Sequence, residues 1–276
     1  MSKGVTVITG AIWLCAAAFI AEAQTVAKDP SVTIQAGKAL LKTALASGDL
    51  KKLGEARAQF AAAAADSGSA ALAHYHVGYT EYLESHLVKD RAAAKSAIDR
   101  AVAALEQAQK SDKKLADAVA LLASCYGEQI GHNPQLGMTL GPKSTMMLLD
   151  AQKLEPKNPR VVLLAGISAY YTPEMYGGSK AEGMKRFEEA AKLFESYRAP
   201  SELHPDWGRD EVHAWIGQAY LEQQKPAEAK RAFEAALKIN PEYGWVKHDL
   251  LPRAEAMLKN PPAKTPESEP APKAGG

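Results

Sequence analysis

A pattern of small and aromatic residues recurs along this chain at the spacing of a pair of antiparallel helices. Its clearest copy lies in residues 210–241, where small residues at Gly217 and Ala229 precede large ones such as Phe233. Small residues let two helices cross closely, and the larger side chains fill the space beside the crossing. Pro241 cannot continue a helix. The pattern therefore predicts two packed helices that end at this proline.

Four weaker copies of the pattern precede this unit. They lie in residues 31–65, 72–109, 118–156 and 159–196. Because one helix pair cannot bury its apolar face alone, such copies must stack into one continuous core. A last helix over residues 243–258 would cover the open end of the stack. The sequence thus predicts an all-α solenoid of about five antiparallel helix pairs with a C-terminal capping helix.

The composition limits what this solenoid can bind. Hydrophobic residues make up 46% of the 276 residues, which is enough for a sizeable core. The formal net charge is +1, so we expect no nucleic-acid partner. Cys125 lies in a helical pattern, and we expect it to be a small buried hydrophobe and not a reactive thiol.

Both ends of the chain differ from the repeats. The N-terminal residues are typical of an export signal, with a positive charge at Lys3, then an apolar stretch, then the sequence Ala21-Glu22-Ala23. The alternative is a membrane anchor, but the stretch is short for one. We expect a signal peptide in residues 1–23, the repeat domain in 24–259 and a disordered Pro-rich tail in 260–276. The mature protein would then be secreted, into the periplasm, with no stable membrane span.

The unit at 210–241 resembles the tetratricopeptide repeat (TPR), whose pattern places small and aromatic residues at these positions. More narrowly, the chain is similar to exported bacterial TPR proteins. This similarity rests on GPKS at 141–144, NPR at 158–160, YYTPEMYGG at 170–178, WG at 207–208, WVK at 245–247 and LLP at 250–252. The resemblance implies a helical superhelix that binds protein or ligand, and it implies no reaction.

Two of the units are longer than the repeat pattern requires. The additional residues fall within 127–141 and 171–178, which are rich in glycine and proline. Insertions at equivalent points of successive repeats project from the same face, so we expect two neighbouring loops that form a binding surface. Its candidate residues are Asn133, Met138, Lys143, Thr172, Glu174 and Tyr176. The alternative is that glycine and proline only shape long turns and the methionines pack in the core.

Two further sets of residues have open interpretations. Arg160 opens a helix, and we expect it to pair with Glu155 or Glu174 or to contact an anionic partner. The tryptophans at 207, 215 and 245 could form a hot spot for protein binding or a ligand cage. The spacing favours their burial between the last repeat and the capping helix.

Motifs that carry chemistry are missing from the sequence. The GPKS segment has the wrong glycine spacing for a phosphate loop and follows a helix, not a strand. There is no H-E-x-x-H motif, no Cys–His cluster and no G-x-S-x-G motif. We therefore expect no catalytic residue, no metal and no cofactor.

These observations predict a non-catalytic binding scaffold in the cell envelope, whose partners are proteins. The alternative is a small-solute-binding protein or a transporter-accessory component of the periplasm. A closed apolar cavity would favour a small ligand, whereas an open groove with exposed aromatic side chains would favour a protein.

Overall fold

The computed structural model describes residues 29–260. The expected signal peptide and nearly all of the expected tail lie outside the described residues. Within that range the regular structure is entirely helical and contains eleven α-helices. None of the helices in this range combines the length and apolarity needed to cross a bilayer.

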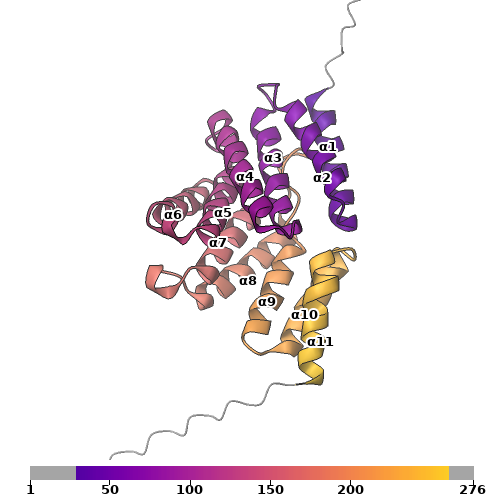
Figure 1. Cartoon of the computed structure of the whole chain (residues 1–276), viewed down its shortest axis with the longest axis vertical. Helices are drawn as coiled ribbons and strands as arrows, with labels where there is room; N and C mark the ends of the chain where they lie inside the picture. The colour runs from indigo at the N-terminus through magenta and orange to yellow at the C-terminus, as the bar shows by residue number, and fades with distance from the viewer. Residues whose placement is uncertain (1–28, 261–276) are drawn as a thin grey trace, which may run out of the picture.

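The helices form five antiparallel pairs followed by a cap, as the repeats predict. The first helices are α1 (Pro30–Ser47), α3 (Ala70–Leu87), α5 (Ala116–His132), α7 (Pro159–Tyr171) and α9 (Glu211–Glu222). Their partners are α2 (Leu50–Ala63), α4 (Arg91–Ser111), α6 (Gly137–Leu154), α8 (Lys180–Ser196) and α10 (Pro226–Ile239). A π-helical turn, η3 (Val246–Leu250), continues into α11 (Leu251–Lys259), which packs on α10. Figure 1 shows these pairs stacked in chain order.

Glycine in the first helix and phenylalanine in the second explain how the pairs cross. A Cβ atom added at Gly217 of α9 would fall on the ring of Phe233 in α10. The same relation joins Gly166 of α7 to Phe187 of α8, and it also occurs in the first pair. Each such phenylalanine is fully buried. The repeated motif is therefore a close helix crossing filled by one ring, which is a local feature that sequence can predict.

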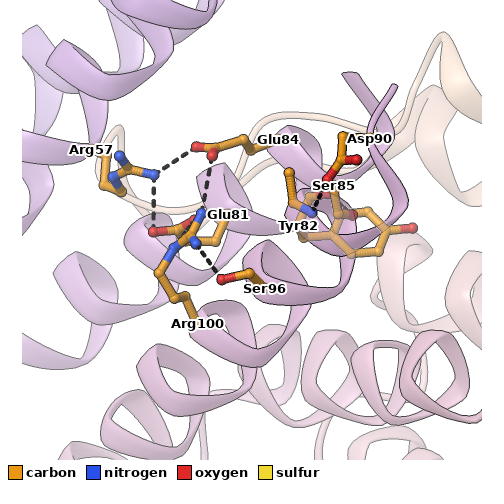
Figure 2. A network of polar contacts seen from close by, with 9 residues as sticks. Arg57, Glu81, Tyr82, Glu84, Ser85, Asp90, Ser96 and Arg100 are labelled. Atoms are coloured by element: carbon orange, nitrogen blue, oxygen red, sulfur yellow. Dashed lines mark hydrogen bonds and ion pairs between the residues drawn. The ribbon is translucent and has the colours of Figure 1, made fainter. Parts of the chain in front are cut away.

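An ion-pair network joins the first two pairs on one side of α3 (Figure 2). Arg57 Nη1 of α2 lies 2.9 Å from Glu81 and 2.6 Å from Glu84 of α3. Arg100 Nη2 of α4 lies 2.7 Å from Glu81 and 3.0 Å from Glu84. Glu81 is buried, so two arginines that flank it from opposite sides compensate its charge.

The prediction of a long loop at residues 127–141 is wrong. Helix α5 continues to His132, and α6 begins at Gly137 after a single 3-10 turn, η1 (Pro134–Leu136). Gly127 and Gly131 have open space where a Cβ would be, so glycine here lies on an uncrowded helix surface and does not end the helix. The additional residues therefore lengthen two helices.

The predicted loop at 171–178 is confirmed in outline. Helix α7 ends at Tyr171, and α8 begins at Lys180, with one 3-10 turn, η2 (Glu174–Tyr176), between them. Gly177 has φ of 89°, a left-handed conformation that glycine adopts without strain. We call residues 172–179 the α7–α8 connection.

Candidate functional site

The connection between α8 and α9, residues 197–210, returns to the N-terminal half of the molecule. It contains no helix or strand and instead runs over the first helices of earlier pairs. Figure 1 shows it as a thin orange loop that rises toward α1 and α3. We call residues 197–210 the strap.

The middle of the strap is held through its backbone carbonyl groups. Lys38 Nζ of α1 donates hydrogen bonds to the carbonyl oxygens of Glu202, at 2.6 Å, and His204, at 2.8 Å. His76 Nε2 of α3 lies 2.7 Å from the carbonyl oxygen of Leu203. A carbonyl can only accept, so this nitrogen must carry the ring proton. Burial lowers the pKa of His76 to about 4, which keeps the ring neutral at physiological pH.

A tryptophan anchors the C-terminal part of the strap. The Trp207 ring stacks on Tyr79 of α3 with ring centroids 4.8 Å apart and planes inclined by 10°. Its Nε1 donates to Tyr75 Oη at 2.8 Å. Gly208 follows with φ of 103°, and a Cβ there would lie 2.6 Å from the Phe194 ring. The strap therefore needs glycine where it turns into α9.

A buried ion pair fixes the N-terminal end of the strap. Arg160 of α7 is 1% exposed, and its Nε donates to Asp117 Oδ1 of α5 at 2.6 Å. Its Nη2 donates to Tyr197 Oη of the strap at 3.0 Å. Burial disfavours the charged guanidinium, but the Asp117 carboxylate outweighs burial and raises the pKa of Arg160. The predicted pairing with Glu155 or Glu174 is wrong, and so is contact with an anionic partner, because the group is enclosed.

The strap ends at a partly buried carboxyl group. Tyr79 of α3 donates to Glu211 Oε1 of α9 at 3.2 Å. Burial and, secondarily, the neighbouring Asp210 raise the pKa of Glu211 to about 8, although the bond from Tyr79 opposes this. Because α3 and α9 belong to the second and fifth pairs, their contact requires the solenoid to curl until the first helices face each other. The strap fills the concave side that this curl creates.

The predicted loop residues have separate environments. Met138 is 83% exposed and Tyr176 is 68% exposed, and Glu174 is also exposed. Thr172 is half-buried at the end of α7. The two remaining residues face their own pair, because Asn133 caps η1 by accepting from Gln135 N, while Lys143 Nζ donates to Tyr126 Oη at 2.6 Å.

The two connections do not form an extensive common interface. The turn η1 packs on α5 and α6, whereas η2 is not among the elements packed against either η1 or α6. A shared binding surface made by both connections therefore stays a prediction. The α7–α8 connection carries an exposed aromatic side chain, Tyr176, whereas residues 133–136 between α5 and α6 contain no aromatic residue.

A row of aromatic side chains extends from that connection to the cap. Tyr171 contacts Trp215 of α9 edge to face with centroids 5.7 Å apart, and Trp215 contacts Trp245 at 5.3 Å. Tyr243 continues the row at 6.4 Å from Trp245. Tyr171 is 48% exposed and Trp245 is 37% exposed. We call these four residues the aromatic strip.

The tryptophans thus only partly follow the sequence prediction. Trp215 and Trp245 are neighbours near the last repeat and the cap, but Trp245 is 37% exposed and is not buried as predicted. Trp207 instead belongs to the strap, far along the chain from its partners in α3. Sequence reasoning missed Tyr171, although its place at the end of a helix before a glycine-rich connection indicated exposure.

Three other features of the described residues bear on chemistry: a surface hollow, the Cys125 thiol and the grouping of metal-binding side chains. A hollow of about 520 Å³ is lined by Glu106, Gln109, Lys110 and Lys113, which are long polar side chains of α4 and the turn that follows it. Burial raises the pKa of the Cys125 thiol, which makes it a poor nucleophile. Within residues 29–260 no three His, Cys, Asp or Glu side chains are grouped so that they could hold a metal ion.

Comparison with known proteins assigns the repeat. Residues 210–243 match a family described as tetratricopeptide repeat. By this match, residues 210–243 are one tetratricopeptide repeat. TPR proteins in general mediate protein–protein interactions and are generally non-catalytic scaffolds. No curated protein matches the chain by sequence.

Two solved structures resemble this chain in fold. The HusA haemophore from Porphyromonas gingivalis is 22% identical with a TM-score of 0.59, over 71% of this chain and 96% of that one. TTC0263, a thermophilic TPR protein from Thermus thermophilus, is 16% identical with a TM-score of 0.59, over 83% of this chain and 100% of that one. At these identities the likeness shows the fold alone.

Proposed function

We propose that this protein is a non-catalytic scaffold of the cell envelope that binds another protein through the aromatic strip and the α7–α8 connection. The observation that carries the proposal is the partial exposure of Tyr171 and Trp245 in one row of contacting rings. Exposed Met175 and Tyr176 lie in the adjoining connection. Tyrosine, tryptophan and methionine are the residues that protein interfaces enrich.

The location in the envelope rests on the N-terminal sequence alone. Cell fractionation of the full chain and of a variant without residues 2–23 tests it. We expect the full chain in the periplasmic fraction, with its N-terminus cleaved after Ala23. Recovery of both forms in the cytoplasm would contradict this part of the proposal.

Site-specific photo-crosslinking in intact cells tests the binding surface. A photoreactive residue is introduced at Tyr176, and a matched one at Lys113, an exposed residue of the turn between α4 and α5. We expect one protein to be crosslinked from position 176 and not from position 113. Replacement of Tyr171 and Trp245 by alanine should abolish this product. A product that persists in the double variant would contradict the assignment of the surface.

The second candidate is the small-solute-binding or transporter-accessory function. One structural relative is described as a haemophore, and the rings of the aromatic strip offer faces and edges to a planar ligand. Haemin is therefore the probe, and quenching of Trp215 and Trp245 fluorescence is the readout. Saturable quenching at one haemin per chain that Trp245→Ala removes would favour this candidate over the scaffold.

A further inference from the structure

We propose that this protein forms a homodimer through the outer face of α6, which packs antiparallel against α6 of a second copy about a two-fold axis. This face carries Met138, Pro142, Thr145, Met146 and Leu149, and we call these five residues the α6 seam. Figure 1 shows α6 at the edge of the molecule. The α6 seam is a different surface from the aromatic strip, so this proposal and the proposed function stand or fail separately.

The α6 seam is exposed because α6 packs chiefly on α5. Buried Ser144 donates to the carbonyl oxygen of Ala123 in α5 at 2.8 Å, which turns the opposite side of α6 to solvent. On that side Met138 is 83% exposed, Met146 59% and Leu149 46%. The other two members of the seam are exposed as well. Single exposed apolar residues are ordinary on a protein surface, whereas a continuous row of them indicates an interface.

The repeat pattern does not require apolar residues on this face. In α6, α8 and α10 a small buried residue precedes a large buried one by four positions, which aligns the three helices on Ser144–Leu148, Gly183–Phe187 and Ala229–Phe233. The exposed residues at the positions of Met146 and Leu149 are Lys185 and Glu188 in α8, and Arg231 and Glu234 in α10. Charged side chains are typical of a solvated helix face. We infer that the outer face of α6, unlike those of α8 and α10, is covered.

The spacing of the α6 seam predicts that its partner is a helix. Met138, Pro142, Thr145 and Leu149 follow one another at intervals of four, three and four residues. This is the spacing of the a and d positions along one side of a two-stranded coiled coil. A second helix can therefore lie along this row.

The α6 seam is complementary to itself when the second helix runs antiparallel and the two-fold axis passes just before Ser144. In this arrangement Leu149 lies against the partner's Met138. Thr145 lies against the partner's Pro142. Rotation about the axis repeats both contacts, as an isologous interface requires. A second copy of the chain can thus cover the whole row.

The space and the charges around the seam suit the same arrangement. It places Met146 opposite the partner's Gly141, and a Cβ atom at Gly141 would have open space around it, which leaves room for the methionine. Asp150 lies beside the first residues of the partner's α6, where the helix dipole favours a negative charge. Lys143 Nζ donates to Tyr126 Oη at 2.6 Å, so Lys143 brings no positive charge into the seam.

The dimer should be weak because a single pair of helices forms it. Helix α6 has 18 residues, which corresponds to a length of about 27 Å. Such a pair buries less than the about 800 Å² per partner of a standard interface. We therefore expect a dissociation constant on the order of 10 µM. A dimer presents two copies of the aromatic strip, which raises the apparent affinity for a partner that has two binding sites.

Sedimentation velocity of the purified protein over about 1 to 500 µM tests the proposal. We expect the sedimentation coefficient to rise from the monomer value to the dimer value across this range. Met146→Glu places a charge in the seam and should raise the dissociation constant at least about tenfold. Lys185→Glu, at the equivalent position of α8, is the matched control and should leave it unchanged. A wild-type chain that is monomeric at every concentration would overturn the proposal, and so would a dimer that Met146→Glu leaves intact.

Gly141→Ala tests the register of the two helices. Alanine favours a helix more than glycine does, so in dilute solution, where the protein is monomeric, this variant should melt at a higher temperature than wild type. The added methyl group takes the space of the partner's Met146 and should raise the dissociation constant of the dimer about threefold or more. A variant that dimerises as tightly as wild type would overturn the register.

Crosslinking through an introduced cysteine tests the position of the two-fold axis. Position 145 lies close to the axis, so a short bismaleimide should join two copies of Thr145→Cys. Glu188→Cys, on the outer face of α8, is the control and should give no dimer, and Cys125 is buried in both variants. Absence of a crosslinked dimer from position 145 would overturn the proposal. Addition of Tyr171→Ala and Trp245→Ala should leave this product intact, and its loss there would assign the interface to the aromatic strip and contradict the α6 seam.

Discussion

The stability of this protein should fall as pH rises through the neutral range because of Glu211. Burial raises the pKa of this carboxyl from 4.5 to about 8. Between these two values the folded state holds a proton that the unfolded state releases. The favourable contribution of the protonated carboxyl is therefore complete below about pH 4.5, declines with rising pH, and is lost above about pH 8.

The size of this effect follows from the same interval. Each pH unit between the two pKa values corresponds to about 1.4 kcal/mol. The interval from 4.5 to about 8 thus represents at most about 4 to 5 kcal/mol of unfolding free energy. Glu211→Gln removes the titration and retains a carbonyl that can accept from Tyr79.

Urea unfolding followed by circular dichroism between pH 5 and 9 measures the effect. Relative to wild type, Glu211→Gln should be about equally stable at pH 5 and several kcal/mol more stable at pH 9. Glu189→Gln, on the exposed face of α8, is the matched control and should show no such trend. Other titrating groups affect wild type and variant equally, so their contributions cancel in the difference between the two unfolding free energies. His76 is one of these groups, because its lowered pKa makes the folded state less stable at acid pH. A difference between wild type and Glu211→Gln that does not change with pH would refute the reasoning.

Four further substitutions have defined outcomes in urea unfolding. Trp207→Ala removes a stacked ring and a hydrogen bond and should cost about 3 kcal/mol; a cost below about 1 kcal/mol would mean that the strap is not held as described. Asp117→Asn leaves Arg160 buried without its counter-charge and should cost about 3 to 5 kcal/mol, so a neutral result would contradict the buried pair. Gly217→Ala forces a methyl group into a filled crossing and should cost about 1 to 3 kcal/mol. Gly131→Ala, in open space on α5, should instead be neutral or stabilising by up to about 1 kcal/mol, and equal costs at both glycines would refute the crossing argument.

The helix pairs are predictable because their determinants are close together in the chain. Gly217 and Phe233 meet across one short turn, and the same contact between glycine and phenylalanine recurs in two other pairs. The length of α5 and α6 escapes prediction because several glycines in one segment ordinarily indicate a loop. At Gly131 the glycine lies on an uncrowded surface, where its cost to a helix is small.

The strap could not be predicted from local patterns. His76 contacts Leu203 across 127 residues, and Lys38 contacts Glu202 across 164 residues. A segment with two prolines and no periodicity has the sequence of an ordinary connection. The partner of Arg160 escapes prediction for the same reason, since Asp117 lies 43 residues earlier in another helix.

The position of the strap on the concave side is the central claim, and carbodiimide crosslinking of the unmodified protein tests it most directly. This reagent joins a lysine to a carboxylate only where the two are in contact. Mass spectrometry should identify a bond between Lys38 and Asp206, whose charged atoms lie 3.3 Å apart. The ion pair Lys230–Glu255, at 3.0 Å, is the internal control. Crosslinking of the control pair without any product that joins Lys38 to the strap would contradict the account.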